Sequence, residues 1–93
     1  MPPPPDKWIV LVEESSGGYR GRRIDNSTLE HVYPSRDMAR QAAFDIAQDH
    51  QPRHPSIVRQ RTVIRRSPDE YTVLVEGLLE THHYEVSVGE LVS

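Results

Sequence analysis

The segment that decides the fold is Ser35–His50, SRDMARQAAFDIAQDH. Its alanines recur at every fourth position: Ala39, Ala43 and Ala47. At 3.6 residues per turn this spacing puts them on one face of an α-helix. Ser35 is a preferred N-cap residue, and Asp37 falls in the first turn, where the helix dipole favours a negative charge. The segment predicts one helix over about residues 35–50, with a stripe of small residues that packs closely against a sheet.

Segments with strand-like patterns flank this helix on both sides. The apolar run Trp8–Val12 predicts an interior strand covered on both faces, at least in part. Residues 81–88 alternate, and the inward set is expected to be His82, Tyr84, Val86 and Val88. Further strands are expected at residues 19–24, 29–33, 57–65 and 71–76. The predicted fold is an α+β two-layer sandwich, an antiparallel sheet of about 4–6 strands in the order ββ(β)αβββ with one helix on one face.

The bulk composition describes a small, polar domain. The chain has 93 residues, 35% of them apolar, and a net charge of −3. This predicts a single α+β domain over residues 7–93, preceded by a disordered, proline-rich tail at residues 1–6. The start has no signal-peptide pattern, and no apolar run approaches the ~20 residues of a membrane helix. We therefore expect a cytoplasmic protein without a membrane partner, and the ten arginines against one lysine suggest a bacterial source.

Arginines are concentrated in two segments. Residues 57–66 and the expected hairpin strand 19–24 supply the candidate nucleic-acid or anion-binding residues: Arg20, Arg22, Arg23, Arg59, Arg61 and Arg65. Several cations on one side of a strand could follow a phosphate backbone. However, six acidic residues and no Lys or Arg lie between Asp69 and Ser93. A solvated face with cross-strand ion pairs, such as Arg61 with Glu76, is the alternative interpretation.

The histidines and hydroxyl residues give little support for metal or catalytic chemistry. His50 and His54 are separated by Pro52, so they do not share one helical face, and His82 and His83 point to opposite sides of a strand. There is no cysteine and no G-x-S-x-G nucleophile motif. We expect no enzyme activity, no metal and no cofactor. His82 and Tyr84 share the inward side and are the candidate lining of a small ligand pocket.

Three functions remain open from the sequence. The first is a non-enzymatic binding or adaptor domain, with another protein as its partner, that acts through an exposed sheet face or an edge strand. The edge would be the strand at residues 19–24 or the last strand through Val88, and the protein would be a monomer or a weak homodimer. The second is a weak nucleic-acid binder through the arginines at 57–66 and 19–24. The third is a ligand-binding domain with the pocket near His82 and Tyr84.

Overall fold

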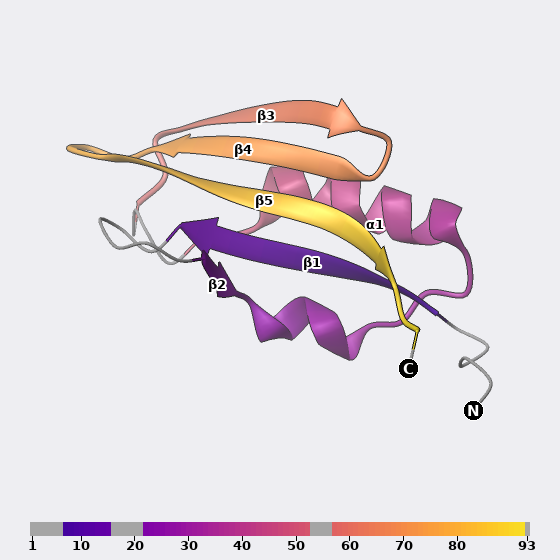
Figure 1. Cartoon of the computed structure of the whole chain (residues 1–93). Helices are drawn as coiled ribbons and strands as arrows, with labels where there is room; N and C mark the ends of the chain where they lie inside the picture. Colours follow the sequence, from indigo (N-terminus) through magenta and orange to yellow (C-terminus); the bar gives the residue numbers. More distant parts are fainter. Residues whose placement is uncertain (1–6, 16–21, 53–56, 93) are drawn as a thin grey trace.

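One antiparallel sheet with a single helix across one face makes up the fold, which confirms the predicted α+β two-layer sandwich (Figure 1). The computed structural model describes residues 7–15, 22–52 and 57–92; the proline-rich segment 1–6 lies outside them. The helix is α1 (Arg36–Asp49). The strand order is β2-β1-β5-β4-β3. The strands are β1 (Trp8–Ser15), β2 (Arg22–Ile24), β3 (Gln60–Ser67), β4 (Glu70–Glu76) and β5 (Thr81–Glu90).

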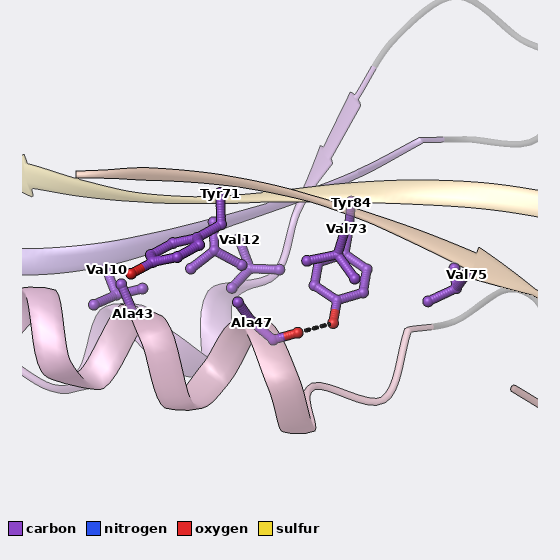
Figure 2. Packing of buried hydrophobic residues seen from close by; sticks show 9 residues of the cluster. Val10, Val12, Ala43, Ala47, Tyr71, Val73, Val75 and Tyr84 are labelled. Carbon is purple, nitrogen blue, oxygen red and sulfur yellow. Dashed lines mark hydrogen bonds between the residues drawn. The ribbon is translucent and has the colours of Figure 1, made fainter. Parts of the chain in front are cut away.

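Helix α1 begins and packs as its sequence predicts. The Ser35 side chain accepts a hydrogen bond from the backbone N–H of Met38 at 3.1 Å, which is the expected N-cap contact. All three alanines of the stripe are fully buried against the sheet. Two of them, Ala43 and Ala47, form one cluster with valines and two tyrosines from three strands (Figure 2). The strand members of this cluster are Val10, Val12, Tyr71, Val73, Val75, Tyr84 and Val86. Small residues on the helix leave room for these larger residues on the sheet.

Within the described part of the chain, no helix has the length and apolar character needed to cross a membrane.

Residues 29–33 do not form the additional strand that the sequence analysis expected. A 3-10 helix, η1 (Asn26–Glu30), occupies most of this segment. The Asp25 side chain caps it by accepting from the backbone N–H of Ser27 at 2.9 Å. Such local side-chain bonds compete with strand pairing. Only Tyr33 pairs with the sheet, as an isolated bridge to Trp8.

The last strand is interior, and the expectation that it forms an edge is wrong. β5 pairs with β1 on one side and with β4 on the other. The edges of the described sheet are therefore β2, with three residues, and β3, with eight. Burial also confirms the predicted inward side of the last strand, since Tyr84 and Val86 are fully buried.

Strand β1 is interior and covered fully on one face and partly on the other, as its sequence predicts. Val10 and Val12 lie under the helix with no exposed surface. Ile9 and Leu11 point to the other face and are half-buried. Both flank Gly89 of the neighbouring strand β5 and lie 3.7 Å from the position that a Cβ would take there, which is an ordinary van der Waals distance.

A carboxylate in the β3–β4 turn ties the sheet to the first turns of α1. Asp69 accepts hydrogen bonds from Arg36 and from Arg40, whose Nε lies 2.7 Å from Oδ1. The hydrogen bond from Arg40, followed by that from Arg36, lowers the pKa of Asp69 to about 2. Because the folded-state pKa is depressed, this clamp stabilises the fold above the ordinary carboxyl pKa. The stabilisation is lost as the pH falls toward the folded-state value.

Candidate binding groove

A groove lies between helix α1 and the edge strand β3. Its main hollow is about 430 Å³ and is lined by Phe44, Gln48, Arg61, Val63, Arg65 and Tyr71. A second hollow of about 350 Å³ shares Phe44, Arg65 and Tyr71 with the first and continues toward the start of the helix. The two hollows form one open groove along the strand. We call these six residues of the main hollow the strand–helix groove.

Two of the predicted arginines, Arg61 and Arg65, lie in this groove and are held there by aromatic residues. Arg61 Nη1 donates to the Tyr84 hydroxyl at 2.8 Å, and Arg65 Nε donates to the Tyr71 hydroxyl at 3.3 Å. The Arg61 Cζ is 5.9 Å from the centre of the Tyr84 ring, and the Arg65 Cζ is 5.8 Å from that of Phe44. Cation–π contacts of this kind favour one side-chain orientation.

These two guanidinium groups are not neutralised by ion pairs within the described part of the chain. No described carboxylate lies within 4.0 Å of either group. Each guanidinium has five N–H donors, and its tyrosine uses one. The groove therefore presents two oriented cations, four residues apart along one strand, to a ligand bound beside β3.

The cross-strand ion pairs expected for the arginine strand are mostly not formed. Arg61 lies opposite Val75, while Glu76 lies opposite Gln60, so the expected pair of Arg61 with Glu76 is wrong. Arg66 does meet the acidic segment, since its Nη1 is 3.7 Å from Glu85 Oε1. That contact is on the sheet face opposite to the helix, and it leaves the groove unaffected.

The remaining candidate arginines do not join this groove. Arg59 is exposed and immediately precedes β3, where its backbone N–H donates to the carbonyl of Glu76 at 2.7 Å. Arg22 and Arg23 belong to β2, at the other edge of the sheet. Four strand spacings of about 4.8 Å separate the two edges, which is roughly 19 Å. Arg20 lies outside the described residues. The candidate arginines are thus divided between two edges.

Tyr84 is a buried residue of the core and holds the end of α1. It is fully buried, and its hydroxyl donates to the backbone carbonyl of Ala47 at 2.6 Å (Figure 2). The same hydroxyl accepts a hydrogen bond from Arg61. Burial raises the pKa of Tyr84 to about 12, although the nearby Arg61 acts in the opposite direction. The Nε2 of His82 lies 3.0 Å from Glu80 Oε2. Neither His82 nor Tyr84 lines the strand–helix groove.

A second cluster of functional groups lies where three separate segments meet. His50 Nε2 is 3.7 Å from Glu14 Oε2 and 3.8 Å from Asp25 Oδ2. The three potential ligand atoms all lie within 4.8 Å of one another. The sequence analysis missed this cluster, because it compared histidines only with residues near them in the chain.

No protein-family model, curated protein or solved structure matches this chain, so the functional proposal depends on the geometry of these sites alone.

Proposed function

We propose that the protein is a non-enzymatic binding domain that takes up an extended, acidic segment of another protein along strand β3. The observation that carries this proposal is the pair of oriented arginines, Arg61 and Arg65, beside an unpaired sheet edge. The edge supplies main-chain hydrogen bonds, and the arginines supply a preference for acidic side chains. The sequence analysis named the strand at residues 19–24 or the last strand as the edge, and did not identify β3.

Strand β3 is a suitable template for an added strand. It is paired only with β4, so alternate backbone N–H and C=O groups on its other side have no partner within the sheet. Its eight residues can pair with a segment of useful length, whereas β2 offers three. When a peptide adds to a sheet edge in this way, main-chain hydrogen bonds provide the affinity, and contacts of alternate side chains provide the specificity.

The groove would receive every second side chain of the added segment. Successive side chains of a strand point to opposite faces, and those on one face repeat every 6–7 Å, roughly. Arg61 and Arg65 are four residues apart on the helix-facing side of β3, with Val63 between them. A segment with carboxylates at every second position would turn all of them to the helix-facing side, which places acidic groups beside both arginines. Its apolar side chains would then lie on the opposite sheet face, beside the exposed Ile64.

Charge favours a foreign acidic segment over a second copy of this chain. In a symmetric antiparallel pairing centred on Val63, Arg61 of one copy would lie directly opposite Arg65 of the other. Like charges directly opposite each other on neighbouring strands are destabilising. The same two positions would be neutralised by glutamate or aspartate on another protein.

The test uses a fluorescein-labelled octapeptide of alternating Val and Glu, with a Val/Lys octapeptide for comparison, in fluorescence anisotropy titrations. We expect the acidic peptide to bind and the basic one not to bind. Arg61→Gln and Arg65→Gln should each weaken binding at least tenfold, roughly, because a hydrogen bond to a charged group contributes about 1.5–3 kcal/mol. Amide NMR shifts should be concentrated on β3 and on the α1 side of the groove.

Arg66→Gln is the matched control, since Arg66 is in the same strand but pairs with Glu85 on the opposite sheet face. Equal loss of binding in Arg61→Gln and Arg66→Gln would mean that only net charge matters, and the proposal would fail. Single-stranded DNA is the alternative ligand. If it binds at low salt, and if Arg61→Gln and Arg65→Gln abolish that binding, the groove would be assigned to phosphate binding instead.

A further inference from the structure

We infer that Glu14, Asp25 and His50 form a binding site for a divalent transition-metal ion, with Zn²⁺ as the ion that fits best. The ligand atoms come from the end of β1, from the residue after β2 and from the residue after α1. This site is separate from the strand–helix groove, and it does not depend on the proposed function.

His50 is the residue that points to a ligand. Only 10% of its side-chain surface is exposed, and its buried Nε2 makes no hydrogen bond. A buried nitrogen that has left water without gaining a hydrogen bond is costly. The two carboxylate oxygens lie 3.7 and 3.8 Å from Nε2, which is beyond hydrogen-bond range but close to this nitrogen. An ion held between the three atoms would satisfy the nitrogen.

The spacing of the three atoms is close to that of a metal site. Tetrahedral zinc with bonds of about 2.0–2.1 Å places its ligand atoms roughly 3.3 Å apart. The two His50 distances, 3.7 and 3.8 Å, exceed this by about half an ångström, and all three ligand atoms lie within 4.8 Å of one another. Side-chain rotation of the two carboxylates would close the set around an ion. One histidine with two carboxylates leaves a fourth position for water, as in zinc sites with three protein ligands.

The surrounding contacts orient two of the ligands. Asp25 Oδ1 accepts from the backbone N–H and the hydroxyl of Ser27 at 2.9 and 2.7 Å, which leaves Oδ2 turned toward His50. The His50 ring lies edge-on to the Tyr84 ring, with centroids 4.9 Å apart. Such contacts behind the ligands are typical of metal sites.

The donor set selects the class of ion. An imidazole nitrogen suits zinc and other transition metals, whereas Mg²⁺ and Ca²⁺ prefer sites made of oxygen ligands alone. Because the site joins three segments that are distant in the chain, a bound ion would tie the end of α1 to β1 and to the residues after β2. Ions that bind the folded form alone stabilise it.

The experiment uses the full chain without an affinity tag, stripped with a chelator and dialysed against Zn²⁺. We expect one zinc per chain by elemental analysis, a higher melting temperature, and a selective shift of the His50 Nε2 resonance in long-range ¹H–¹⁵N spectra. Loss of a contact behind a ligand already costs 10- to 100-fold in metal affinity, roughly. Glu14→Gln, Asp25→Asn and His50→Gln should each weaken zinc binding by at least that factor.

Asp25→Asn keeps a residue that caps η1 well, so this variant tests the carboxylate while the fold is preserved. His83→Gln is the matched control, because His83 is exposed on β5. The inference is overturned if the wild type binds no zinc, if the zinc shifts another histidine, or if His83→Gln reduces binding as much as His50→Gln does. The spectrum of the wild-type protein decides the question even if one variant does not fold.

Discussion

Replacing Tyr84 by phenylalanine tests the link between the helix end and the groove. The hydroxyl donates to the Ala47 carbonyl at 2.6 Å and accepts from Arg61 at 2.8 Å, and the residue is fully buried. Each hydrogen bond contributes about 0.5–1.5 kcal/mol, and a buried carbonyl left without a partner adds to the loss. We expect Tyr84→Phe to lower the free energy of unfolding by about 2 kcal/mol.

The assay is urea denaturation followed by circular dichroism, with thermal unfolding as a second measurement. For a domain of this length, 1 kcal/mol corresponds to about 4–8 °C, so the melting temperature should fall by about 8–16 °C. Tyr71→Phe is the matched control. Its hydroxyl meets only the Arg65 Nε, at 3.3 Å, and its loss should cost less than about 0.5 kcal/mol.

Equal destabilisation by the two substitutions would refute this reasoning, because it would show that the two buried hydrogen bonds of Tyr84 add nothing beyond ring packing. The substitution also releases Arg61 from its fixed position. If the groove binds acidic segments, Tyr84→Phe should therefore also weaken the binding of the Val/Glu octapeptide. This binding should be measured at low temperature, where the fold remains intact.

Three further predictions concern the fold and can be measured by the same urea denaturation. Asp69→Asn should cost about 1 kcal/mol at neutral pH and almost nothing near pH 2. The depressed pKa of Asp69, about 2 against 3.8, corresponds to about 2.4 kcal/mol before solvent screening reduces it; an equal cost at both pH values would contradict the clamp. Ala43→Leu should destabilise by about 1–3 kcal/mol through overpacking, while Gln41→Leu on the exposed side of α1 should stay within about 0.5 kcal/mol. Ser35→Ala should cost about 1 kcal/mol and Ser35→Asn much less, because asparagine also caps a helix; equal losses would exclude the cap as the cause.

Much of the fold could be predicted because the responsible signals are local. The Ser35 cap, the alanine stripe and the alternation of residues 81–88 act within a few residues of the chain, and each one is confirmed. The expected strand at 29–33 fails for a related reason. The cap at Asp25 is also a local signal, but it competes with the strand pattern of residues 29–33. The sequence did not show which of the two local structures would be more stable.

The candidate sites could be predicted only in part. Arg61 and Arg65 were identified, since two cations of equal parity share one side of a strand. Phe44 and Gln48 were not assigned to the same site, because the helix–strand distance depends on packing. The cluster around His50 was missed, since its members are 11 to 36 positions apart in the chain.

The sequence by itself determined where the helix lies, which of its faces is buried and which residues of the last strand point inward, because backbone geometry repeats over a few residues. Tertiary structure alone decided that β5 lies between β1 and β4, that β3 is left as the long edge, and that Glu14, Asp25 and His50 converge. Strand order and such convergence arise from pairing and packing between distant segments, which periodicity along the chain does not encode.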